Sequence, residues 1–181
     1  STTDGSCALS IQTLSCYYLQ LGLGLNNAVA LVQDATIRGM LTWQNGHTIQ
    51  SNSRLSIYDT IADYGASFAG FTMDSSTLDI RRSTFKYPST CTGTAADCTK
   101  WAFRFYSPGT ITDSIISFAD STVTAPSHGL VFEAATSLGV GSKLVLDAST
   151  LGSGCGGTNC IYVYQALQIT LAGCTMEGTA T

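Results

Sequence analysis

The fold is decided by an eight-residue pattern that is clearest at Leu144-Val145-Leu146-Asp147-Ala148-Ser149-Thr150-Leu151. By residue type the pattern is apolar, any, apolar, any, any, small, Thr, apolar, and it occurs in full five times. The other full copies begin at Ala30, Leu78, Ile116 and Ile169, and a copy that is one residue short covers Leu55 to Ile61. Such self-similarity is typical of stacked repeats, in which each unit buries its apolar face only against its neighbours.

The threonine of each copy measures the length of the repeat. Successive threonines lie 24, 24, 38, 28 and 25 residues apart, which gives a basic period near 24 with insertions. The longest interval contains a polar segment at about 86–99, which we expect to be a loop pushed out from one coil. The marker threonines are Thr36, Thr60, Thr84, Thr122, Thr150 and Thr175.

Apolar and other residues alternate within the pattern at a period of two, as in a half-buried β-strand. Two short strands that meet at a corner fit this alternation, and an aromatic-rich stretch such as 101–105 precedes each copy as a third strand. We therefore predict an all-β fold, a right-handed parallel β-helix (β-solenoid) of about six to seven rungs, with three strands and three corners per rung. The β-helix covers 17–181, and residues 1–16 form a partial rung or a cap.

This repeat length and its inward–outward pattern resemble those of single-stranded right-handed parallel β-helix proteins, such as the pectin-lyase-like superfamily and phage tailspikes and fibres. The resemblance covers most of the chain and rests on the repeat pattern. It implies the fold and a tendency towards carbohydrate or cell-surface roles. It transfers no catalytic residue, because the chain carries no family-specific motif.

The composition argues against several classes of function. Charged residues make up 11% of the 181 residues, less than half of the roughly 25% that is usual in globular proteins. The net charge is −4, and the basic residues form one sequence pair, Arg81-Arg82, which argues against nucleic acid as a partner. No apolar run reaches the roughly 20 residues of a membrane span. A surface covered by Ser, Thr, Asn, Gln and Gly suits an extracellular, cell-surface or virion-surface protein.

Six of the seven cysteines fall in pairs that are close in sequence. Local pairs favour disulfide-closed loops in an oxidising compartment. Metal binding is a rival interpretation, but no CxxC spacing occurs and the chain has two histidines, His47 and His128. Free thiols in a cytosolic or phage setting are a third interpretation of the cysteines. Cys174 takes the small position of a repeat copy, where we expect a packing role. The disulfide candidates are Cys7 with Cys16, Cys91 with Cys98, and Cys155 with Cys160.

Acidic residues are the candidates for catalysis, since glycoside hydrolysis needs a pair of carboxylates. Most of the outward carboxylates lie at or beside the corner of the pattern, where Asp suits turn geometry. Arg81 and Arg82 next to Asp79 form the one charged cluster, which we interpret as a solvated surface patch. Neither histidine belongs to a motif with a nucleophile. We therefore predict no catalytic residue, metal ligand or cofactor. The outward carboxylates are Asp34, Asp59, Asp79, Asp120 and Asp147.

Stacked rungs would align the marker threonines about 4.8 Å apart in one outward ladder. Such an array could order water, as in ice-binding solenoids, but its flanking positions are too irregular for a flat ice plane. Ladders of β-branched side chains also stabilise a sheet without any ligand. Ice binding is therefore our third functional hypothesis. The flanking positions are Leu31, Ser56, Asp79, Ser117, Val145 and Thr170.

The end of the repeat supports the leading hypothesis. The last copy ends at Met176 with no amphipathic segment after it. Either further chain follows, or the open end is used, since open solenoid ends recruit further strands. We predict a non-enzymatic structural module of an extracellular filament, surface fibre or virion appendage, which forms a homo-oligomer or polymer through uncapped β-helix ends. The alternative is a domain that binds or cleaves polysaccharide, in which Trp43, Trp101 or Tyr162 lies exposed beside an acidic pair.

Overall fold

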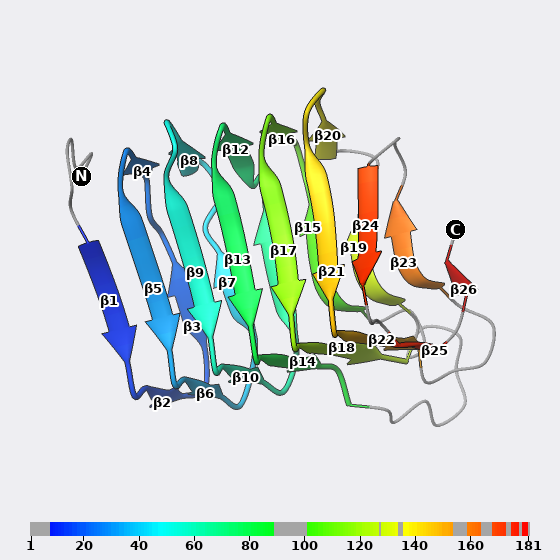
Figure 1. The fold of residues 1–181 in the computed structure, drawn as a ribbon. Coiled ribbons are helices and arrows are strands. Elements are labelled where there is room, and N and C mark those ends of the chain that lie inside the picture. The colour runs from blue at the N-terminus through cyan, green and yellow to red at the C-terminus, as the bar shows by residue number, and fades with distance from the viewer. Residues whose placement is uncertain are drawn as a thin grey trace.

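The computed structural model describes residues 8–88, 101–126, 128–133, 136–153, 159–163, 168–172, 175–177 and 179–180. Within these residues the regular structure is β-strand, arranged in four sheets whose strands are all parallel. The chain runs down the sheet that faces the viewer, along the bottom, up the back and over the top, while it advances from left to right (Figure 1). This path is that of a right-handed parallel β-helix, so the predicted fold class is confirmed.

Four sheets, which we name by their place in Figure 1, line the solenoid. The front sheet contains β1 (Ala8–Gln12), β5 (Val29–Gln33), β9 (Arg54–Tyr58), β13 (Thr77–Arg81), β17 (Ile115–Ala119), β21 (Lys143–Asp147) and β24 (Gln168–Ala172). The bottom sheet contains β2 (Ser15–Cys16), β6 (Thr36–Ile37), β10 (Ile61–Ala62), β14 (Thr84–Lys86), β18 (Thr122–Ala125), β22 (Thr150–Ser153) and β25 (Thr175–Glu177). The back sheet contains β3 (Leu19–Leu21), β7 (Leu41–Trp43), β11 (Ala66–Ala69), β15 (Trp101–Tyr106), β19 (His128–Phe132), β23 (Asn159–Val163) and β26 (Thr179–Ala180). The top sheet contains β4 (Leu25–Asn26), β8 (Thr48–Gln50), β12 (Thr72–Asp74), β16 (Gly109–Thr112) and β20 (Thr136–Leu138).

Each of the first five described coils contains four strands, not the three that the sequence predicted. The additional strand belongs to the top sheet, whose members are only two to four residues long. In β8 and β12 one apolar residue is buried, Ile49 and Met73, between more exposed neighbours. A single apolar residue carries no periodicity, so the pattern could not separate these strands from the corner beside them.

The first described residues already belong to the solenoid. β1 pairs with β5 at all five positions, and β2 pairs with β6. The segment at about 86–99, predicted to be an inserted loop, begins at the last residue of β14, and residues 89–100 lie outside the described residues. The strands on both sides of it keep their register, since Thr84 pairs with Thr122 and Leu78 with Ile116.

Inward side chains of successive coils stack into a continuous core. In the back sheet Trp43, Phe68, Phe105 and Phe132 occupy equivalent positions, and each is at most 2% exposed. Their ring centroids lie 6.0, 5.5 and 4.6 Å apart in that order. Aromatic pairs at such distances contribute about 0.5–1.5 kcal/mol each beyond the burial of their area. This aromatic file therefore ties the middle coils together.

Two rows of buried hydroxyl groups flank the front sheet and connect successive coils. In the row between the front and bottom sheets, the backbone N–H groups of Thr60, Ser83 and Ser121 donate to the hydroxyl of the next coil at 3.1–3.2 Å. The hydroxyl of Ser121 in turn donates to the carbonyl of Ala119 at 2.8 Å. The row between the top and front sheets uses the same N–H to hydroxyl bonds. That second row consists of Ser53, Ser76, Ser114 and Ser142, all buried.

A residue in the left-handed backbone region precedes the small residue at the front–bottom corner. Asp34, Asp59 and Asp120 have φ of 52°, 50° and 50°. Asp and Asn tolerate this region better than most residues, because their short polar side chains bond locally. The corner role expected for these three acids therefore has a backbone cause. Asp147 is the last residue of β21, and Ala148 takes the left-handed position after it.

We predict that Ser121→Ala lowers the free energy of unfolding by about 1–3 kcal/mol, because it leaves the buried N–H of Ser83 without an acceptor. Urea denaturation followed by circular dichroism measures this loss. Ser137→Ala removes an exposed hydroxyl from β20 and should change stability by less than about 0.5 kcal/mol. Equal effects of the two substitutions would contradict a role of the hydroxyl row in joining the coils.

Candidate functional site

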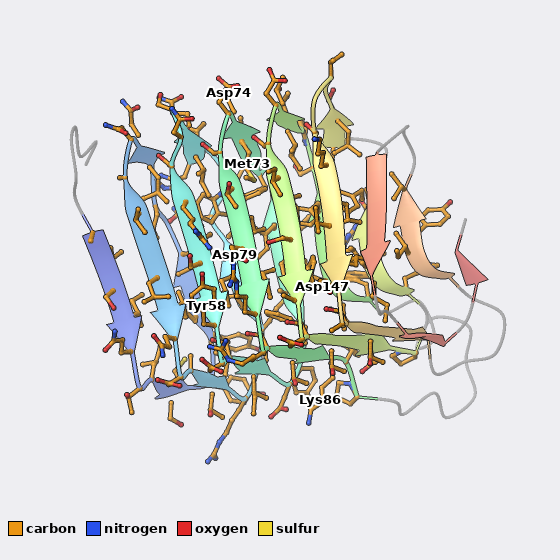
Figure 2. All side chains as sticks on the ribbon, viewed as in Figure 1. Tyr58, Met73, Asp74, Asp79, Lys86 and Asp147 are labelled. Atoms are coloured by element: carbon orange, nitrogen blue, oxygen red, sulfur yellow. The ribbon has the colours of Figure 1, made fainter. Side chains whose placement is uncertain are left out.

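A buried carboxylate lies at the centre of the outer face of the front sheet. Asp79 points outward from β13, yet its side chain is only 2% exposed, because residues of neighbouring strands cover it. Its carboxylate accepts hydrogen bonds from Tyr58 Oη at 2.7 Å, Arg81 Nε at 3.0 Å and Ser117 Oγ at 2.9 Å, and from Arg54 Nη2. Figure 2 shows Asp79 and Tyr58 on this face.

The surroundings of Asp79 keep it ionised. Burial alone would raise the pKa of the carboxyl, but the hydrogen bonds from Arg81, Tyr58, Arg54 and Ser117 outweigh burial and lower the pKa from 3.8 to about 2. A carboxylate with this pKa and four donors is a poor general acid or base at neutral pH. The network is therefore suited to holding β9, β13 and β17 together.

The predicted solvated patch at Arg81 and Arg82 is thus only partly correct. The two arginine side chains are about half exposed, but Asp79 beneath them is buried. Arg82 belongs to a separate pair, in which Nε and Nη2 each donate to a carboxylate oxygen of Asp59 at 2.7 Å. These bonds lower the pKa of Asp59. The sequence did not indicate Arg54 and Tyr58 as partners, because they meet Asp79 only through the register between coils.

The outer face of the back sheet carries a second cluster. The guanidinium of Arg104 lies 3.9 Å from the centroid of the Trp101 ring and 4.2 Å from that of the Tyr106 ring, and it forms an ion pair with Glu133. The cation is thus held between two aromatic rings beside one carboxylate.

The aromatic residues named from the sequence have different environments. Trp43 does not provide the exposed aromatic residue that the polysaccharide alternative requires, because its ring packs in the core against Phe68 and Phe71. Trp101 is half-buried and stacks on Arg104, whose ion-pair partner is the single acid Glu133. Tyr162 stacks on His128, with ring centroids 5.3 Å apart.

The threonine ladder is interrupted at one position. The register places Ile61, not Thr60, between Thr36 and Thr84. Thr60 instead takes the small position of its copy and donates to the carbonyl of Tyr58 at 2.9 Å, as Ser83 does to that of Arg81. The copy that looked one residue short has eight residues, with Ile61 in place of the marker threonine and Ala62 as its last apolar residue. The paired threonines of this outward file are Thr84, Thr122, Thr150 and Thr175.

The cysteine pairs stay a prediction. Cys16 forms no disulfide with another described residue, is half-buried and packs against the core from β2. Its predicted partner Cys7 lies outside the described residues, as do Cys91, Cys98, Cys155 and Cys174. Cys160 lies in β23, at a position where only the backbone is described.

Exposed tyrosines gather at the corner between the bottom and back sheets. Tyr17, Tyr18 and Tyr64 are 58%, 66% and 40% exposed. The ring of Tyr17 meets that of Tyr18 edge-to-face at 4.7 Å, and the ring of Tyr64 meets that of Tyr87 edge-to-face at 5.6 Å. We call these four residues the tyrosine edge. The sequence analysis missed it, although Tyr18, Tyr64 and Tyr87 each follow the last apolar residue of a repeat copy by two positions.

Among the described residues, no three His, Cys, Asp or Glu side chains come together as metal ligands. Over the same part of the chain, no helix has the length and hydropathy needed to cross a membrane. No protein family model, no curated protein and no solved structure matches the chain.

Proposed function

We propose that the chain is a structural segment of an extracellular filament, surface fibre or virion appendage that associates end to end with further copies of itself. The observation that carries this proposal is the exposed core of the first described coil. Leu9 is 42% exposed, whereas Ala30, its pairing partner in the next coil, is 1% exposed. Other apolar residues of the first coil are only partly buried, namely Ile11, Leu14, Cys16, Leu19 and Leu23.

The backbone of the first coil also favours association. β1 is the outermost strand of the front sheet, and in the part of the chain that the structure describes, nothing pairs with its outer edge. An edge strand of this kind is a template for another strand. Consecutive coils pair residue for residue along the front sheet from β1 to β24. A coil of a second copy therefore has the spacing of backbone and apolar groups that the exposed coil requires.

Three further observations support a rod outside the cell. The repeat pattern resembles that of phage tailspikes and fibres and of the pectin-lyase-like superfamily. The low charged fraction and the locally paired cysteines suit an oxidising, extracellular setting. The outward carboxylates are held by structural contacts, since Asp59 and Asp79 are ion-paired with arginines and Asp34 and Asp120 hold corner positions. Support for the polysaccharide-cleaving alternative is correspondingly weak.

The association of the wild-type chain should rise with concentration, and Leu9→Lys should weaken it about tenfold or more, because the charge must be desolvated at the joint. Sedimentation velocity across a concentration series measures this, and negative-stain microscopy shows whether rods form. Val140→Lys, at a corner residue that is 91% exposed, is the control and should leave association unchanged. A wild-type chain that stays monomeric at all concentrations would contradict the proposal.

A further inference from the structure

We infer that the tyrosine edge is a binding site for an extended neutral polysaccharide. Three exposed aromatic rings on one corner of a solenoid are unusual for a surface that touches only water, and exposed aromatic patches mark interaction sites. Tyrosine combines an apolar ring face with a hydroxyl group. A sugar ring has the complementary combination, with C–H groups on its faces and hydroxyl groups around its rim.

The ring of Tyr18 is seated on the backbone of the next coil. Gly39 occupies the equivalent corner position there, and a Cβ atom at Gly39 would lie 2.9 Å from Cε1 of Tyr18 and 2.4 Å from the carbonyl oxygen of Tyr17. Only a residue without a side chain leaves room for this arrangement. The Tyr18 ring therefore has a fixed seat although it is 66% exposed. A ring that is already placed loses little freedom on binding, which favours affinity.

The second half of the edge is also built before any ligand arrives. The backbone N–H of Tyr64 donates to the carbonyl of Gly39 at 3.0 Å, which fixes the corner of one coil to that of the coil before it. Tyr87 packs against the core and supports the ring of Tyr64 from the following coil. Tyr64 therefore presents its ring from a rigid base.

The spacing of the rings suits a polymer. The corner positions of Tyr18 and Tyr64 are two coils apart, which corresponds to about 10 Å along the solenoid axis. This distance is comparable to the length of a disaccharide unit in an extended glycan chain. A polysaccharide that lies along the corner can thus place alternate sugars on the two rings, whereas a monosaccharide can reach only one.

Ring faces, and not charges, are the main contacts that this corner offers, which favours a neutral glycan over an acidic one. Lys86 lies on the bottom edge of the molecule (Figure 2) and forms an ion pair with Asp63 at 3.2 Å, so its charge is compensated. Arg38, in the adjacent corner position, is exposed and can donate hydrogen bonds to sugar hydroxyls. Tyr18 belongs to the first described coil, which the proposed function uses for association, so sedimentation of each variant is compared with that of the wild-type chain.

Retention on insoluble cellulose, chitin and xylan tests the inference, with a glycan array to cover other neutral polymers and polygalacturonate as the acidic probe. The wild-type chain should bind at least one neutral polymer. The double variant Tyr18→Ala/Tyr64→Ala should bind that polymer at least about tenfold more weakly, because both ring faces are lost. Tyr18→Phe/Tyr64→Phe keeps the faces and should retain most of the affinity. Val140→Ala is the matched surface control.

Circular dichroism of each variant confirms folding, since the substituted side chains are largely exposed. Binding to no neutral polymer, or equal binding by the wild-type chain and the Tyr18→Ala/Tyr64→Ala variant, would overturn the inference. Binding to polygalacturonate alone, abolished by Arg38→Gln, would also overturn it, because the arginine and not the rings would then select the ligand. If the tyrosine substitutions changed the sedimentation of the chain and no glycan bound, the edge would be a contact between copies and the glycan assignment would be refuted.

Discussion

Replacing Phe105 with alanine is expected to lower the free energy of unfolding by about 3–5 kcal/mol. The Phe105 ring is fully buried and lies within 5.5 Å, centroid to centroid, of the rings of Phe68, Phe71, Phe103 and Phe132. Its removal leaves a cavity in the middle of the aromatic file, and coils on either side cannot close it because their backbones are fixed by the sheets. Urea denaturation monitored by circular dichroism measures the loss.

The neighbouring residue provides the control for this substitution. Tyr106 lies on the same strand but points outward, where its ring stacks on Arg104. Tyr106→Ala should cost only about 1 kcal/mol, the usual range for a partly exposed cation–π contact. Phe105→Leu, which retains much of the volume, should cost about 1.5 kcal/mol or less. If Tyr106→Ala lowered stability more than Phe105→Ala, the assignment of Phe105 to the inward face of β15 and of Tyr106 to the outward face would be contradicted.

Asp79→Asn is expected to lower the free energy of unfolding by about 2 kcal/mol at pH 7, and this difference should shrink as the pH falls. The pKa of Asp79 is lowered from 3.8 to about 2 in the folded chain. A depressed pKa stabilises the folded state above pH 3.8, and the contribution is lost as the pH falls through about 2. The value of 2 kcal/mol is an upper limit, because Arg54 and Arg81 are 42% and 47% exposed and partly hydrated.

Denaturation curves of the wild-type chain and the variant at pH 7, 5, 3 and 2 test this dependence. The difference in unfolding free energy should be nearly constant between pH 7 and 5, fall to about half near pH 3 and be mostly lost at pH 2. Asp147→Asn, at an exposed carboxylate on the same sheet, should change stability by less than about 0.5 kcal/mol at every pH. A difference for Asp79→Asn that does not vary with pH would show that shape, and not charge, makes the network stable.

The sequence predicted the solenoid because its strongest signals are local. The alternation of Leu144 and Leu146 and the small residue at Ser149 recur from the coil of β5 to that of β21, and each depends only on a side chain facing inward or fitting a corner. The strands of the top sheet were not predicted, because a single buried residue such as Ile49 produces no periodicity in the sequence. Thr60 was misplaced because threonine and serine are interchangeable at the buried hydroxyl position, so residue type alone could not fix the alignment.

The candidate surfaces were harder to predict than the fold. Tyr58 and Arg54 reach Asp79 from another coil. Arg104 is held by two rings of its own strand, although Trp101 has the strand parity of the inward Phe103 and Phe105. Such contacts depend on the exact offset between coils of unequal length. Trp43 illustrates the same limit, because an aromatic residue in a strand faces the core or the solvent according to a shift of one position.

The constancy of register despite unequal coil lengths has a practical meaning for engineering. Thr84 and Thr122 pair as neighbours although 38 residues separate them, as Ser15 and Thr36 do with 21. Alignment is held by the front sheet and its two hydroxyl rows, so additional chain can be inserted between Pro88 and β15 without displacing a rung. The molecule can therefore serve as a display scaffold, in which a peptide grafted at this point is presented beside the tyrosine edge while the coils before and after it keep their places.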